Sequence, residues 1–203
     1  SIKDARNPLL MIGAGANRKE ARRAISEFIG AIGIPFCNTQ MGKGVVDESS
    51  DYFLGTAALS DKDYLHDYIK EADLIINIGH DVVEKPPFFM EHNGAKVIHI
   101  NYKSAQVDQV YFPQIEVVGD IALSVDALAD ALGSKLDLDL RDFEKVRDNV
   151  KREIYRLDDE PSFPMRPQHI VSEIRNLMGY HDIIALDNGV YKIWFARNYL
   201  AFQ

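Results

Sequence analysis

The sequence predicts an α/β protein with a doubly wound parallel sheet, followed by an incomplete α-β-α piece of a second domain. Short apolar runs typical of strands alternate along the chain with segments whose apolar residues recur at helical spacing. A glycine turn joins the first run to the first helical segment. The run at residues 72–79 is almost wholly apolar and ends in glycine, as expected for a strand buried on both faces of a parallel sheet. Alternation of this kind indicates βαβ units with right-handed crossovers.

The chain divides into three expected parts. These are a first α/β domain at residues 1–135, a charged helix and linker at 136–164, and the beginning of a second domain at 165–203. The expected strands are residues 8–12, 34–39, 72–79, 96–101, 115–119 and 182–187. The expected helices are residues 18–29, 61–71, 121–132, 137–159, 166–178 and 192–202.

The first strand leads into a turn that contains Gly13, Ala14 and Gly15. The glycines let the backbone turn without a Cβ clash, and Asn17 is the expected cap of the following helix. Backbone N–H groups at such a turn suit a phosphate. However, the third glycine of a G-x-G-x-x-G fingerprint would fall on Arg18. A tight structural turn and a nucleotide contact therefore both stay open here.

The second strand ends in the loop Gln-Met-Gly-Lys-Gly at residues 40–44. Two glycines around a lysine suit either a flexible turn or an anion cradle, since the full P-loop pattern is not present. A polar loop follows at residues 47–51, and the short helix after it is expected to be capped by Ser60 or Asp61. The side chains that it is expected to bury are Tyr64, Leu65, Tyr68 and Ile69.

Polar residues follow the third strand at the carboxyl end of the sheet, where open α/β sheets bind ligands. His80, Asp81 and Glu84 form either a metal cluster or a set of solvated, ligand-adjacent groups. Because no second ligand pair at a recognisable spacing supports a metal, we predict none. His99 in the fourth strand is expected to be a hydrogen-bonded sheet histidine. The fifth strand runs into Asp120, the expected N-cap of the next helix.

The character of the sequence changes near Gly133. Residues 137–159 are highly charged, with apolar positions at helical spacing, which predicts a solvated helix with one narrow apolar stripe. The stripe consists of Phe143, Val146, Val150, Ile154 and Leu157. Pro161 and Pro164 mark a linker and a domain boundary. The helix, strand and helix that follow have no sheet of their own to join, so we expect a second domain that has begun and been cut off.

Composition narrows the possible functions. A net charge of -8 argues against nucleic acid or an anionic membrane as the main partner, and favours small molecules or other proteins. The single cysteine, Cys37, cannot form an internal disulfide and indicates a reducing, cytoplasmic setting. No run approaches the roughly 20 apolar residues of a membrane span, and the N-terminus lacks the apolar core of a signal peptide. Ser1 and Gln203 are both expected to be cut ends.

These motifs, taken in order, resemble the central, Rossmann-like domain of thiamine-diphosphate-dependent enzymes, in particular acetolactate synthase large subunits. The matching residues are 8–15, 34–44 with Gly55, 72–79, 96–100 and 119–120. Residues 166–168 and 186–194 resemble the start of the family's diphosphate-binding domain. The resemblance implies an enzyme that decarboxylates pyruvate on thiamine diphosphate and joins it to a second 2-keto acid, with Mg²⁺ as a second cofactor. It also implies a homo-oligomer in the intact enzyme.

The resemblance implies no catalytic residue and no metal ligand in these 203 residues. The family's activating glutamate belongs to a pyrimidine-binding domain, and its G-D-G…N metal motif lies further along the diphosphate domain. A fragment without turnover of its own is therefore expected. The residues implied to contact thiamine diphosphate are Gly189, Val190 and Tyr191, where the family usually has G-x-H. The alternative is that this turn only caps the following helix.

The resemblance leaves FAD open. Biosynthetic acetolactate synthases bind FAD with an arginine-containing loop after the third strand and an acidic residue after the fourth. This chain has His80 at the start of the first of these positions and Asn101 at the second, which favours a flavin-free relative. The candidate residues of an FAD or nucleotide cleft are Gly13, Ala14, Gly15, His80 and Asp120.

Two other functions remain as alternatives. One is another thiamine-diphosphate enzyme, a 2-keto acid decarboxylase or an oxidase. The other is a non-catalytic nucleotide-binding or subunit-interface module.

Overall fold

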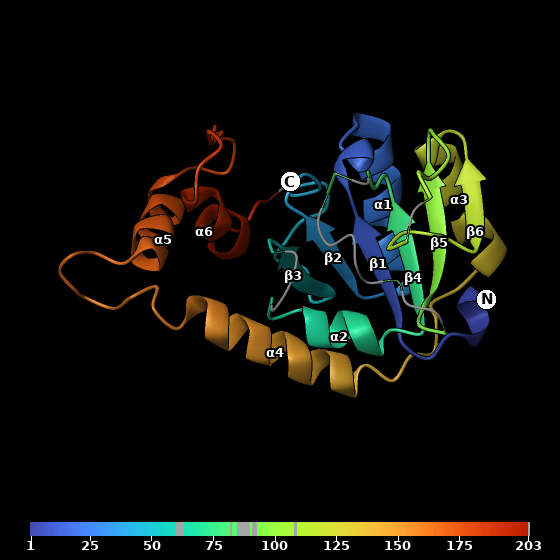
Figure 1. The fold of residues 1–203 in the computed structure, drawn as a ribbon, viewed down its shortest axis with the longest axis horizontal. Coiled ribbons are helices and arrows are strands. Elements are labelled where there is room, and N and C mark those ends of the chain that lie inside the picture. Colours follow the sequence, from blue (N-terminus) through green and yellow to red (C-terminus); the bar gives the residue numbers. More distant parts are fainter. Residues whose placement is uncertain (60–62, 82, 85–89, 91–92, 108, 203) are drawn as a thin grey trace.

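A parallel sheet of six strands forms the centre of the part of the chain that the structure describes (Figure 1). The structure is a computed structural model that describes residues 1–59, 63–81, 83–84, 90, 93–107 and 109–202. The strands are β1 (Pro8–Ile12), β2 (Phe36–Thr39), β3 (Phe53–Ala57), β4 (Leu74–Ile78), β5 (Lys96–Asn101) and β6 (Ile115–Val118). Their order is β3-β2-β1-β4-β5-β6, and every neighbouring pair is parallel. The predicted doubly wound parallel sheet is confirmed, with its winding reversed between β1 and β4.

Four helices cover the two faces of the sheet: α1 (Lys19–Ile32) and α3 (Ile121–Leu132) on one face, α2 (His66–Glu71) and α4 (Arg141–Tyr155) on the other. The helices α5 (Pro167–Leu177) and α6 (Tyr191–Asn198) lie together beyond the β3 edge (Figure 1). The 3-10 turns are η1 (Ile2–Asp4) and η2 (Ala14–Ala16). Because side chains alternate along a strand, Leu10 and Ile12 of β1 pack against α1 and α3. Leu9 and Met11 pack on the other face, against α2 and α4.

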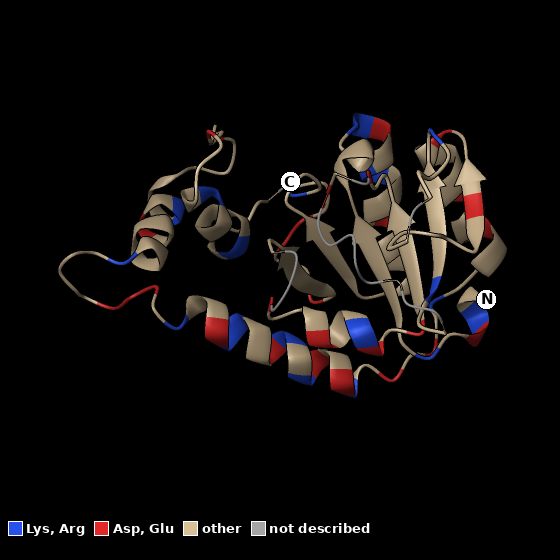
Figure 2. Cartoon of the chain, viewed as in Figure 1, with Lys and Arg blue, Asp and Glu red and all other residues tan. Residues whose placement is uncertain are grey.

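The charged helix α4 lies beside α2 and passes β3 on the way to α5 (Figures 1 and 2). Its acidic and basic residues alternate along its length, whereas β1 and β4 carry none. Phe143, Val150 and Ile154 of the predicted stripe are buried in the core on the α2 face. Val146 packs on the same core, and Leu157 lies beyond the end of the helix.

The predicted cap of α1 and the predicted starts of α2 and α4 are wrong; α4 begins at Arg141, not at residue 137. Asn17 does not cap α1, because η2 takes up the residues before it and Arg18 becomes the N-cap, without a side-chain cap bond. The short helix α2 begins only at His66. Its expected caps, Ser60 and Asp61, lie outside the described residues. The predicted inward residue Tyr64 is 44% exposed, because residues 63–65 form a turn ahead of the helix.

Two strand predictions also need correction. The sequence reasoning missed β3, because its short apolar run is interrupted by Gly55 and preceded by polar residues. The strand expected at residues 182–187 does not form. A strand needs a neighbour to accept its hydrogen bonds, and no strand of the described chain pairs with this segment. Ile183 is accordingly exposed.

Candidate functional site

The carboxyl ends of β1 and β4 meet at the point where the winding of the sheet reverses. The N–H of Gly13 donates to the carbonyl of Ile78 over 2.8 Å, and the N–H of Gly15 donates to the carbonyl of Gly79 over 2.8 Å. A Cβ on Gly13 would lie 2.7 Å from the Cα of His80. The glycines after β1 are therefore needed for a close approach to the chain after β4.

Gly79, directly after β4, must also be glycine. Its φ is +68°, in the left-handed region, and a Cβ there would lie 2.3 Å from the backbone nitrogen of Ala16. The two glycine turns thus fix each other's backbone, with or without a ligand. We call the place where they meet, at the ends of β1, β2 and β4, the switch-point crevice.

Glu84 fills the switch-point crevice from the loop after β4. Its carboxylate accepts the N–H of Ala14 at 3.0 and 3.1 Å, the N–H of Asp81 at 2.8 Å, and the hydroxyl of Thr39. Glu84 is only 4% exposed. Burial raises its pKa, and the hydrogen bonds from Thr39, Ala14 and Asp81 oppose that rise. Every one of these contacts gives the carboxylate a donor, as its ionised form requires.

The other N–H groups of the first turn are also in use. Ala16 donates to the carbonyl of Gly13, and Asn17 donates to that of Ala14, each over 3.1 Å. The guanidinium of Arg18 lies 4.3 Å from the centre of the Tyr102 ring. The turn therefore offers its donors to the protein itself. In this arrangement it does not fit the pyrophosphate of FAD or of another dinucleotide.

His80, a candidate for the FAD cleft, is brought next to the glycine turn and is buried. Its ring lies 5.1 Å from that of Tyr111. Burial, and then the neighbouring His99, lower the pKa of His80 to about 4. His80 is therefore neutral near pH 7 and supplies no positive charge to a phosphate.

His99 is confirmed as a hydrogen-bonded sheet histidine. Its Nε2 lies 3.0 Å from the carbonyl of Lys103, which only accepts, so Nε2 carries the proton. Nδ1 then accepts the hydroxyl of Tyr111 at 2.7 Å, and the Tyr111 oxygen accepts from the amide of Asn77 at 3.0 Å. This buried chain of polar groups joins β4 and β5 to the segment before β6.

The side chain of Asp120, the remaining candidate of the nucleotide cleft, serves as a helix cap. Asp120 follows β6, and its Oδ1 accepts the N–H of Leu123 at 3.0 Å, which confirms it as the N-cap of α3. Among the residues that the structure describes, no group of three His, Cys, Asp or Glu side chains is placed to hold a metal ion.

The turn predicted to contact thiamine diphosphate lies at the start of α6. Val190 and Tyr191 are exposed, and the Tyr191 ring lies over Gly189, where a Cβ would be 2.3 Å from Cε1. Lys192 Nζ donates to the side chain of Asn188 over 2.6 Å. The turn thus brings together helix N-terminal amides, a phenol and an ammonium group. This set of donors fits the phosphates of thiamine diphosphate in its chemistry.

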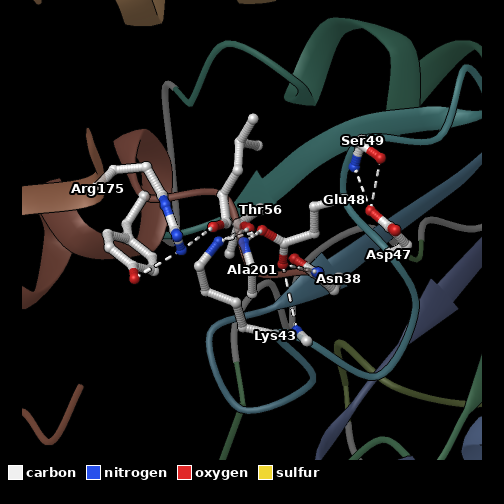
Figure 3. Close-up of polar contacts among 11 residues, drawn as sticks. Asn38, Lys43, Asp47, Glu48, Ser49, Thr56, Arg175 and Ala201 are labelled. Atoms are coloured by element: carbon white, nitrogen blue, oxygen red, sulfur yellow. Dashed lines mark hydrogen bonds and ion pairs between the residues drawn. The ribbon is translucent and has the colours of Figure 1, made fainter. Parts of the chain in front are cut away.

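The sequence reasoning missed a polar cluster around Glu48 (Figure 3). The buried Glu48 carboxylate accepts from Asn38 Nδ2 at 2.8 Å, from Lys43 Nζ at 2.5 Å and from the N–H of Ala201 at 2.8 Å. The N–H of Glu48 in turn donates to the carbonyl of Ala201 over 3.1 Å. The loop at residues 40–44 is therefore held by an ion pair, and its lysine is already paired with a carboxylate. The spacing of Lys43 and Glu48 follows no helix or strand period, so no sequence pattern indicates their contact.

A cavity of about 740 Å³ lies between the 40–44 loop and the α5–α6 pair. Lys43 and Arg175 line it, and both have partners within the protein. Arg175 donates to the Tyr199 hydroxyl over 2.7 Å and to the carbonyl of Met178 over 2.8 Å. Lys43 and Arg175 are thus committed to the fold, whereas Arg22 of α1 and Lys192 of α6 also line the cavity.

The sheet order, the paired glycine turns and the covering helices define the class of the protein as a Rossmann-like α/β domain. Residues 1–128 match the model of the family described as "Thiamine pyrophosphate enzyme, central domain". The chain belongs to this family, and the resemblance inferred from its motifs is confirmed.

Three relatives illustrate how far the similarity extends. The chain is 26% identical to an acetolactate synthase of Bacillus subtilis over 209 residues, which cover 100% of the chain and 36% of that protein. It is 29% identical to a catabolic acetolactate synthase of Raoultella terrigena over 212 residues, covering 100% of the chain and 37% of that protein. An acetolactate synthase large subunit of Pyropia yezoensis is 32% identical over 133 residues, 64% of the chain and 22% of that protein. The chain spans about a third of the length of the first two relatives.

None of the helices in the described part of the chain combines the length and the apolar character that a membrane crossing requires.

Proposed function

We propose that this chain is part of an acetolactate synthase-like enzyme that decarboxylates pyruvate and joins it to a second 2-keto acid. The observation that carries the proposal is the similarity to acetolactate synthases over 100% of the chain. That similarity continues past the matched central domain into α5 and α6. We assign no catalytic residue within these 203 residues.

Thiamine diphosphate would supply the electron sink for the loss of carbon dioxide, which protein side chains do not provide. In this proposal Gly189, Val190 and Tyr191 hold its diphosphate: the N–H groups of Val190 and Tyr191 and the Tyr191 hydroxyl donate to it, and Gly189, whose N–H donates to the carbonyl of Asp187 over 3.1 Å, shapes the turn. Lys192 adds a positive charge beside them. Mg²⁺ would accompany the diphosphate, with ligands that we do not assign to the described residues.

The proposed role of the central domain is structural. The glycine turn after β1 is bonded to the protein itself, which favours an enzyme that works without FAD. The proposal also includes a small-molecule 2-keto acid as substrate, a homo-oligomeric enzyme and a cytoplasmic location.

The test is an assay of the protein that contains this chain, with thiamine diphosphate, Mg²⁺ and pyruvate. We expect carbon dioxide and acetolactate to form together. Carbon dioxide without acetolactate would replace the proposal by a 2-keto acid decarboxylase, and the absence of both products would reject it.

The contact at α6 has its own test. Tyr191→Phe removes the hydroxyl donor and is expected to weaken thiamine diphosphate binding by about tenfold. Tyr180→Phe is the matched control, because Tyr180 is also an exposed tyrosine of this part of the chain. Equal affinity for the cofactor in both variants would remove Tyr191 from the proposed site.

A further inference from the structure

The switch-point crevice holds a carboxylate at the position where α/β sheets of this order bind ligands. Three donors converge on Glu84 from three separate parts of the chain. The N–H of Ala14 comes from the turn after β1, the hydroxyl of Thr39 from the end of β2, and the N–H of Asp81 from the loop after β4. Backbone N–H and hydroxyl groups are the same donors that bind phosphate oxygens in nucleotide sites.

We propose that Glu84 is an internal anion that takes the place of a nucleotide phosphate and closes the switch-point crevice to such ligands. In this role Glu84 is a positioning and specificity-determining residue. It ties the ends of β1, β2 and β4 together with hydrogen bonds that a bound phosphate would otherwise make. The inference concerns the central domain alone and does not depend on the proposed activity.

The described residues around Glu84 already use the space and the hydrogen-bond donors that a phosphate would need. A Cβ on Gly13 would lie 2.8 Å from Glu84 Oε1, so the space made by the glycine is already taken by the carboxylate. A phosphate at the Ala14 amide would meet this buried negative charge, where repulsion is little screened. Among the described residues, His80 beside the turn is neutral near pH 7, and the guanidinium of Arg18 lies over the Tyr102 ring.

The experiment is a calorimetric titration of the purified protein with ADP, and with adenosine as the ligand without phosphate. The wild type is expected to bind ADP no better than adenosine. Glu84→Ala is expected to bind ADP about tenfold tighter or more, because it removes the charge and frees the Ala14 amide. Asp81→Asn is the control, since it removes an exposed carboxylate of the same loop that does not accept from the glycine turn. It is expected to behave as the wild type.

A second measurement decides the question without any variant. In the wild type the amide resonance of Ala14 is expected to shift with pH as Glu84 titrates, and to stay in place when inorganic phosphate is added in excess. A phosphate-dependent shift of this resonance would overturn the proposal. So would an affinity of the wild type for ADP above that for adenosine, or a folded Glu84→Ala protein with no gain over Asp81→Asn.

Discussion

The attachment of α6 to the sheet domain gives the sharpest test of the structure. Arg197 of α6 donates from Nε and Nη2 to Asp63 Oδ1, at 3.1 and 2.6 Å. The side chains are 12% and 1% exposed, so the pair is almost entirely buried. The perturbation is Arg197→Met, which removes the guanidinium and keeps most of the apolar stem.

The expected loss follows from what remains at Asp63. Removing one partner of a buried ion pair typically costs about 3–5 kcal/mol, because the other charge stays buried. Asp63 keeps three backbone donors: the N–H groups of Ala58 and Leu59, each 2.9 Å from its Oδ2, and the N–H of Tyr64, 3.0 Å from its Oδ1. We therefore expect the lower end of the range, a loss of about 3 kcal/mol in the free energy of unfolding.

The assay is urea denaturation followed by two signals. Fluorescence of Trp194, the single tryptophan, reports on α6, and far-UV circular dichroism reports on the whole chain. In Arg197→Met the fluorescence transition is expected to move to lower urea than the dichroism transition, because α6 loses its contact with the sheet domain. The matched control is Arg156→Met, whose partner Glu153 is exposed, with an expected loss below about 0.5 kcal/mol.

One result would refute this reasoning. If Arg197→Met lowers the urea midpoint no more than Arg156→Met does, the buried pair does not hold α6 in place. Combining Arg197→Met with Asp63→Asn adds a double-mutant cycle. The loss in the double variant should be smaller than the sum of the single losses, because neither partner is then left as an unpaired buried charge.

Three further predictions concern the switch-point crevice and α3. Gly79→Ala is expected to destabilise the protein by about 3 kcal/mol or more in chemical denaturation, because of its positive φ and a backbone clash. Gly119→Ala, where a Cβ meets nothing within 4 Å, should change stability by less than about 0.5 kcal/mol. Asp120→Ala removes the side-chain cap of α3 and should cost about 1 kcal/mol by the same measurement. Because the pKa of Glu84 is raised in the folded state, the folded protein keeps that proton longer than the unfolded chain. Relative to Glu84→Gln, the wild type should therefore lose stability as pH rises from the ordinary glutamate pKa through the raised one.

Each of these three predictions has a result that would contradict it. Equal stability of Gly79→Ala and Gly119→Ala would mean that the two turns do not approach as closely as the structure shows. An unchanged denaturation midpoint in Asp120→Ala would show that the side-chain cap of Asp120 does not stabilise α3. Parallel curves of stability against pH for the wild type and Glu84→Gln would show that the pKa of Glu84 is not raised by folding.

Hydrophobic patterning predicted most of the sheet. β1 and β5 have the expected bounds, because each is an uninterrupted strand-like run. Strand β3 was not predicted, because Gly55 divides a short apolar run that shows no periodicity. At residues 182–187 a strand was predicted and does not form. The composition of this segment suits a strand, but the segment has no pairing partner among the described residues. Strand propensity is local, whereas strand formation depends on a neighbour.

The polar contacts were much less predictable. Glu84 and Ala14 are separated by 70 residues, Arg197 and Asp63 by 134, and Glu48 and Ala201 by 153. No spacing rule along the chain links such pairs, because only the completed sheet and its crossovers bring them together. The sequence identified Glu84 as one of three polar residues near a ligand-binding edge, and the structure adds that its carboxylate points back into the fold.

The direction of the Glu84 carboxylate affects how the glycine turn after β1 is interpreted. Gly13 and Gly79 are required by the approach of two backbones to each other, and this requirement exists whether or not a nucleotide binds. Glycine spacing therefore indicates the doubly wound fold more securely than it indicates a ligand. The discriminating residue lies on the neighbouring loop, where a cation or a small residue would leave the amides to a phosphate. A buried carboxylate such as Glu84 accepts from them instead, so in this family the loop after β4 should be examined before a nucleotide is assigned to the turn after β1.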